Sequence, residues 1–187
     1  MSLFEFLMVF VSIIIGLGVA EVLTGIAQQI RNRESIQSYW VHSVLVAMVF
    51  FALLQQWWEV WGLRFEPEWP FHGLVMMVSG PVGLFLIAHL LYPEPMRGVD
   101  IREYYYGVMR PVWWLGVFTV VFSTVFRPLI FGHDLYTLDN ASSLLFLVGF
   151  IVLAISRRPI LHASVVPVFL AVILLDVLQG DPVIGIN

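Results

Sequence analysis

One glutamate and three histidines lie in or at the edges of long apolar stretches of this chain. Glu21 lies nine residues before the end of the apolar stretch Phe4–Ile30, a depth of about 13 Å at 1.5 Å per helical residue. A glutamate side chain is too short to reach the headgroups easily from such a depth. His42, His89 and His162 lie near the inner ends of three further apolar stretches. Because successive spans alternate in direction, all three histidines are expected at a similar depth in the inner leaflet.

A carboxylate and imidazoles at one depth allow three kinds of chemistry. They could hold a metal ion, relay protons, or, as a bis-histidine pair on two helices, ligate a b-type haem. The alternative is that each histidine is simply hydrated at the membrane interface. The sequence leaves these interpretations open, because matched depth does not show that the rings face each other.

A second polar set is expected toward the outer leaflet. Glu5 begins the first apolar stretch, Glu59 ends the second, Arg127 lies inside the fourth, and Asp176 lies near the end of the sixth. Arg127 could pair with Asp176 or Glu59, which would offset the cost of each charge, or it could bind an anionic group. The acidic residues outnumber the arginine, so this set favours cations.

Two prolines are expected to make apolar helices irregular. Ser79-Gly80-Pro81 falls in the middle of the third stretch, and Pro167 falls in the sixth. A proline removes one backbone hydrogen bond and frees a carbonyl. Such sites often mark binding sites in transporters, although a plain kink is the simpler interpretation.

The first apolar stretch carries small and polar residues at every fourth position. Ser12, Gly16, Ala20, Thr24 and Gln28 fall on one face of a helix. This small-residue face is interpreted as a packing surface inside the bundle or between copies, or else as the lining of a path. The candidate path residues over the whole chain are Glu21, Thr24, Ser79, Pro81, Glu59, Arg127 and Asp176.

Several chemistries are excluded by composition. All nine basic residues are arginine, so no lysine is present to form a Schiff base. The absence of cysteine rules out disulfides, thiolate metal sites and c-type haem attachment. The net charge of −4 argues against a nucleic-acid partner. No nucleotide-binding, zinc-hydrolase or serine-hydrolase motif is present, so no catalytic residue is assigned. The sequence favours a protein that is not an enzyme and leaves open an enzyme that acts on lipid.

The elements that position these residues follow from the apolar content. Of the 187 residues, 60% are hydrophobic and only 12% are charged, whereas a soluble domain averages about 25% charged residues. A membrane helix needs roughly 20 mostly apolar residues. The chain is therefore predicted to be all-α, a single polytopic transmembrane domain over residues 1–187 with six spans. The spans are Phe4–Ile30, Ser38–Trp61, Phe71–Tyr92, Val112–Phe131, Ala141–Ser156 and Ile160–Leu178.

The arginines predict the orientation. Seven of the nine fall in the loops after spans one, three and five, which places those loops in the cytoplasm and both termini outside. The seven are Arg31, Arg33, Arg97, Arg102, Arg110, Arg157 and Arg158. The stretch Val99–Arg110 is interpreted either as a short helix on the inner surface or as a plain loop.

Three functions remain open at this stage. The first is a small channel or permease for a proton, cation or small solute in the bacterial inner membrane, acting as a homo-oligomer. The second is a redox subunit in which His42, His89 and His162 bind b-type haem or quinone. The third is a non-catalytic scaffold or assembly subunit. The partners are the lipid bilayer and, for each function, further copies or an unidentified membrane subunit.

Overall fold

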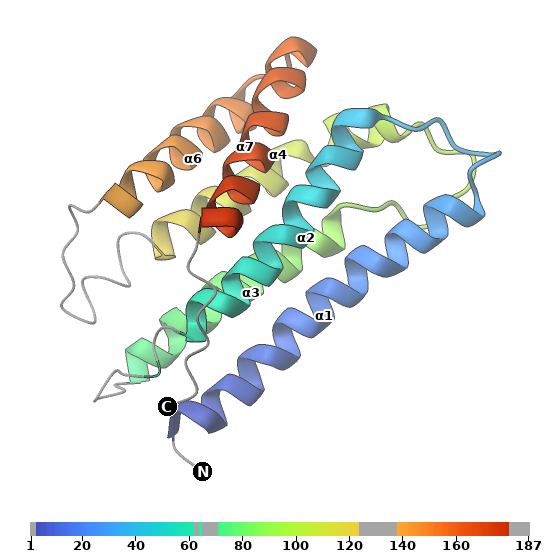
Figure 1. Ribbon diagram of the computed structural model, residues 1–187. Coiled ribbons are helices and arrows are strands. Elements are labelled where there is room, and N and C mark those ends of the chain that lie inside the picture. The colour runs from blue at the N-terminus through green and yellow to red at the C-terminus, as the bar shows by residue number, and fades with distance from the viewer. Residues whose placement is uncertain (1–2, 62–63, 65–70, 124–137, 180–187) are drawn as a thin grey trace.

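The computed structural model describes residues 3–61, 64, 71–123 and 138–179. All regular elements within these residues are helices, and no strand occurs among them. Figure 1 shows how these helices are arranged. The helices are α1 (Leu3–Arg31), α2 (Trp40–Trp61), α3 (Phe71–Leu90), α4 (Ile101–Val121), α6 (Leu138–Ile155) and α7 (Pro159–Gln179).

The structure confirms the all-helical class and the six helices. Four of them, α1, α2, α3 and α7, are long and apolar enough to cross a membrane. The apolar part of α6 that can be described, Ser143–Ile155, is shorter, and the sequence also made this the shortest span. These four helices define an integral membrane protein by length and composition.

The start of α4 differs from the sequence prediction. The fourth span was expected to begin at Val112, but α4 begins at Ile101 and continues past Arg110 without interruption. The Asp100 carboxylate accepts hydrogen bonds from the backbone N–H groups of Arg102 and Glu103, at 2.8 and 3.3 Å. This N-cap satisfies two donors that the first helical turn leaves free. The helical interpretation of residues 99–110 is therefore the right one, although this helix belongs to α4 itself.

The proline positions do not interrupt their helices. α3 is helical from Phe71 to Leu90 with Pro81 inside it, and α7 is helical on both sides of Pro167. The Ser79 hydroxyl donates to the carbonyl of Met76 at 2.7 Å, one turn before the proline. The structure thus shows no unwound segment at either proline.

The helices pack in a regular order. α1 packs against α3, α3 against α4, and α4 against α6, while α2 contacts α1, α3 and α7. α6 and α7 follow each other in the chain but contact each other little. α2 therefore links the first three helices to the last one, and α4 links α3 to α6.

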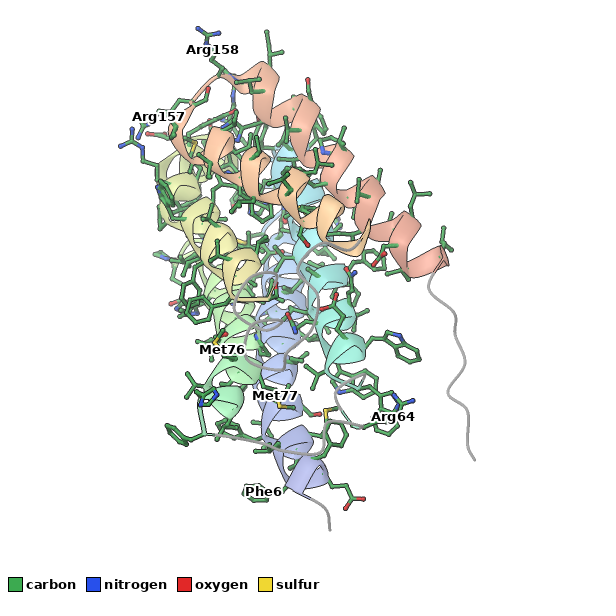
Figure 2. All side chains as sticks on the ribbon, turned by 90° about the vertical axis from the view of Figure 1, so that its left-hand side faces the viewer. Phe6, Arg64, Met76, Met77, Arg157 and Arg158 are labelled. Atoms are coloured by element: carbon green, nitrogen blue, oxygen red, sulfur yellow. The ribbon has the colours of Figure 1, made fainter. Side chains whose placement is uncertain are left out.

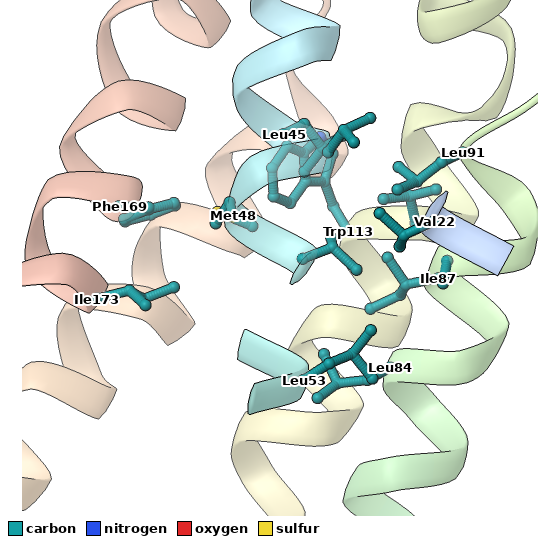
Figure 3. Close-up of a cluster of buried hydrophobic side chains, with 14 of the residues drawn as sticks. Val22, Leu45, Met48, Leu53, Leu84, Ile87, Leu91, Trp113, Phe169 and Ile173 are labelled. Atoms are coloured by element: carbon teal, nitrogen blue, oxygen red, sulfur yellow. The ribbon is translucent and has the colours of Figure 1, made fainter. Parts of the chain in front are cut away.

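Two groups of buried side chains hold these pairs together. Figure 3 shows Val22, Leu53, Leu84 and Ile87 meeting between α1, α2 and α3, with Trp113 and Phe169 on the α4 and α7 side. In the second group, the ring of Phe169 lies 4.9 Å from that of Phe146 and 5.2 Å from that of Phe150 between centroids. Both groups consist of apolar side chains.

The arginine-rich loops share one end of the bundle. Figure 2 shows Arg157 and Arg158 at the end opposite Phe6. Two other loops meet by backbone hydrogen bonds, from Gln37 N–H to the Val99 carbonyl at 3.1 Å and from Ile101 N–H to the Gln37 carbonyl at 3.0 Å. Here this end is called the arginine end, and its seven arginines are all exposed.

A substitution at Gly149 tests how tightly the rings of Phe146, Phe150 and Phe169 pack. A Cβ at Gly149 would lie 2.1 Å from the ring of Phe169, which is fully buried. We expect Gly149→Ala to lower the free energy of unfolding by about 1–3 kcal/mol through overpacking, measured by chemical unfolding in detergent. Gly107→Ala is the control, because no described atom lies within 4 Å of its Cβ position. Equal stability of the two variants would contradict this packing.

Candidate functional site

The structure brings one acid and one base together on the outside of the bundle. The Nδ1 atom of His89 on α3 lies 3.4 Å from Oε1 of Glu21 on α1. The His89 side chain is 57% exposed and that of Glu21 is 40% exposed. The ring of Phe85 stacks on that of His89, with centroids 6.3 Å apart. A carboxylate and an imidazole are side-chain types that proteins use for proton transfer and for binding cations.

The depth of the pair is set by α3 rather than by α1. α1 continues for ten residues beyond Glu21 (31 − 21), whereas α3 ends one residue after His89 (90 − 89). α1 therefore extends beyond the end of α3. The position of Glu21 in α1 therefore suggests a greater depth in the membrane than the position of His89 in α3 does.

His42 lies elsewhere, in the protein core. Its side chain is buried, and Nε2 lies 2.7 Å from the carbonyl oxygen of Leu91, just after α3 ends. Because a carbonyl only accepts, Nε2 carries the proton. The Tyr104 hydroxyl donates to the next carbonyl back, that of Leu90, at 3.0 Å. His42 and Tyr104 thus cap the C-terminal end of α3, whose last carbonyls have no intrahelical donor.

His162 has the same role at the end of α6. Its Nε2 lies 2.7 Å from the Ser156 carbonyl oxygen, one residue after α6 ends. Its Nδ1 lies 2.7 Å from the hydroxyl of Tyr105. Because the Ser156 carbonyl only accepts, Nε2 carries the ring proton, and the Tyr105 hydroxyl therefore donates to Nδ1. Both nitrogens of His162 are therefore used in hydrogen bonds.

These settings do not fit haem ligation by a histidine pair. A b-type haem would need two histidines whose free ring nitrogens face each other across the cofactor. His162 has no free ring nitrogen, His42 caps α3, and His89 pairs with Glu21 on the exposed face. Within the described part of the chain, no ring contact or hydrogen bond joins two of these histidines. No group of three or more metal-ligating side chains occurs there either.

The outer polar set is organised around α2. The Gln55 amide donates to the Asp176 carboxylate on α7, and the Trp57 indole N–H donates to the Ser12 hydroxyl on α1 at 3.1 Å. Successive helical residues point about 100° apart, so neighbouring positions of α2 reach different helices. Asp176, one of the two candidate partners for Arg127, accepts a hydrogen bond from an amide.

Gln56 of α2, between Gln55 and Trp57 in the sequence, contacts α3. Gln56 lies against Gly80 on α3, where an added Cβ would come within 2.8 Å of the Gln56 side-chain oxygen. Ser79, beside Gly80, uses its hydroxyl within α3. Glu59 is half-buried one turn further along α2. Arg127 lies outside the described residues, so its expected ion pair remains a prediction.

The middle of the small-residue face of α1 is exposed, although Ser12 at one end of it contacts Trp57 of α2. Gly16, Ala20 and Thr24 are exposed, and no described atom lies within 4 Å of a Cβ position at Gly16. The close helix contacts of α1 are made instead by Gly18 and Gly25, where a Cβ would meet the side chains of Leu53 and Tyr92, respectively. Of the interpretations given to this face, packing inside the bundle does not hold for Gly16, Ala20 and Thr24, whereas packing between copies or lining a path remains a prediction.

Sequence reasoning missed the capping role of the histidines. The available signal was position, because His42 and His162 both fall in the first four residues of a helix that follows a loop. Tyr104 and Tyr105, which complete the two caps, lie in the first turns of α4, before the predicted start of the fourth span. The chain matches no protein family, no curated protein and no solved structure.

The caps can be tested by removing them. We expect His42→Leu and His162→Leu each to lower the free energy of unfolding by about 1–3 kcal/mol, because a buried carbonyl loses its donor. His89→Leu is the matched control and should change it by about 0–1 kcal/mol, as for an exposed ion pair. Chemical unfolding in detergent measures all three. A His89 variant that is less stable than the other two would refute the assignment.

An absorption spectrum tests the cofactor interpretation. Because the three histidines do not form a bis-histidine site, we expect protein purified from haem-supplied cells to show only tryptophan and tyrosine absorption. A Soret band that shifts on reduction with dithionite, and is lost in His42→Ala or His162→Ala, would overturn the structural role given to these residues.

Proposed function

We propose that the protein is a subunit of a membrane pathway for protons or small cations, with Glu21 and His89 as the groups that bind the transported charge. The observation that supports this most is the acid–base pair itself, formed between two helices that are long and apolar enough to cross a membrane. Ionisable groups in membrane helices are costly and commonly functional.

The pair differs from the two buried histidines in being accessible. His42 and His162 are committed to helix ends, whereas Glu21 and His89 are about half exposed. An exposed pair can meet water or a transported ion without any rearrangement of the core. The Gln55–Asp176 contact gives a second polar position toward the other end of the bundle.

The path would run along the outside of a single chain. Between the two polar positions, the interior of α1, α2 and α3 is filled by apolar side chains such as Leu53, Leu84 and Ile87. A charge moving past this apolar core needs a surface shared with another subunit. This supports a working unit of more than one chain, as the sequence analysis expected.

The proposed setting is the bacterial inner membrane. Seven exposed arginines at the arginine end favour that end as the cytoplasmic one, with both termini outside. Glu21 and His89 then lie toward the cytoplasmic side, and Asp176 lies toward the outer side.

Flux measurements test the proposal. In liposomes carrying a pH-sensitive dye, we expect Glu21→Gln and His89→Asn each to lower proton flux by about tenfold or more, because each removes one proton-transfer group. Glu34→Gln and His72→Asn are the matched controls, since both wild-type side chains are exposed and lie away from the pair. The same liposomes with sodium or potassium gradients decide between protons and cations.

The outcome is decisive in both directions. Loss of flux in the two pair variants, with normal flux in the two controls, supports the pathway. Wild-type liposomes whose proton, sodium and potassium fluxes equal those of empty liposomes would remove the transport function. The scaffold interpretation would then be the better one.

A further inference from the structure

The Glu21–His89 pair interrupts an exposed apolar surface on α1 and α3. Leu17 of α1, one turn before Glu21, is 53% exposed, and Leu86 of α3, one turn before His89, is 41% exposed. The acid and the base are thus surrounded by a surface suited to hydrocarbon or to another protein.

Hydrocarbon is a poor environment for this pair. A carboxylate and an imidazole expose polar atoms that lipid chains cannot hydrogen-bond. Thr24, one turn from Glu21, also exposes a hydroxyl on this side. A protein partner that offers polar groups at the same depth would satisfy all three.

We propose that a second copy of this chain covers this face, placing the Glu21–His89 pairs of two subunits against each other about a two-fold axis along the membrane normal. The face carries both an acid and a base, so it is complementary to itself. In a two-fold interface the same patch serves both subunits. Copies inserted in one orientation also bring residues of equal depth opposite each other.

The backbone of α1 allows the close approach that such an interface needs. Gly16 and Ala20 lie on the exposed side, next to Glu21. Gly16 has open space where a side chain would be, so packing within one chain does not explain a residue that weakens helices. Small residues at a helix–helix interface let two backbones come close.

Single-cysteine crosslinking tests the interface in native membranes. The chain has no cysteine, so each introduced thiol reports only on its own position. With copper phenanthroline as oxidant, we expect Ala20→Cys to shift from monomer to disulfide-linked dimer. Val168→Cys is the control, because Val168 is 51% exposed on α7 and lies away from this face. A monomeric Ala20→Cys protein, or equal crosslinking at both positions, would overturn the proposal.

A bulky substitution separates dimerisation from folding. Gly16→Leu projects into open space in the single chain, so the monomer should fold with an unchanged thermal unfolding temperature. We expect it to lose the dimer, measured as the loss of paired bleaching steps from fluorescently labelled protein in liposomes. A folded Gly16→Leu variant that stays dimeric would contradict the interface.

Exchanging the acid and the base tests the electrostatic part. Glu21→His alone places only imidazoles on the face and should weaken the dimer. The double variant Glu21→His/His89→Glu restores one acid and one base per chain and should restore the dimer. A double variant as weak as the single one would contradict charge matching across the axis.

This inference builds on the proposed multi-chain pathway, but its tests do not measure flux. A dimer crosslinked through Ala20→Cys in a protein without flux would retain the interface and remove the transport function. Flux that depends on Glu21 in a protein that forms no dimer would retain the transport function and remove the interface.

Discussion

The need to satisfy backbone carbonyls at helix ends within an apolar bundle shapes the structure. The last four carbonyls of a helix have no intrahelical donor, and water is scarce in the interior of an apolar bundle. α3 ends beside the first residues of α2, and α6 ends beside the first residues of α7. His42 supplies the donor after α3, and His162 supplies it after α6. Each cap ties two helices that would otherwise meet only through apolar contacts.

The need for donors at helix ends gives the three histidines two different roles, and the position of each histidine decides which role it has. A histidine at the start of a helix, buried beside another helix end, becomes a fixed donor. His89, in the last turn of α3 and facing outward, keeps its ring accessible and meets Glu21 instead. The same residue type at a similar depth thus gives structural links in two cases and a protonatable pair in the third. The proposed function depends on this division, since it leaves only His89 of these three histidines for chemistry.

Much of the fold could be predicted because apolar length alone identifies helices of this kind. The ends of α1, α2, α3 and α7 fall within about two residues of the predicted spans, a normal scatter for helix boundaries. The start of α4 was missed because its first turns carry arginines and tyrosines, which read as a surface segment. The Glu21–His89 contact could not be predicted, since sequence gives depth but not the rotation of α1 against α3. For the same reason the sequence could not decide whether the small-residue face packs inside the bundle or between copies, and it did not show that Gly18 and Gly25 make the close contacts.

The most direct test of the capping account is the position of the proton on each buried imidazole. Solid-state NMR of protein labelled with ¹⁵N-histidine in bilayers distinguishes the two ring nitrogens, with assignment from the His42→Leu and His162→Leu variants. The account expects a protonated Nε2 and an unprotonated Nδ1 for both residues, because each Nε2 faces a carbonyl that can only accept. A proton on Nδ1 with a bare Nε2 at either residue would contradict it.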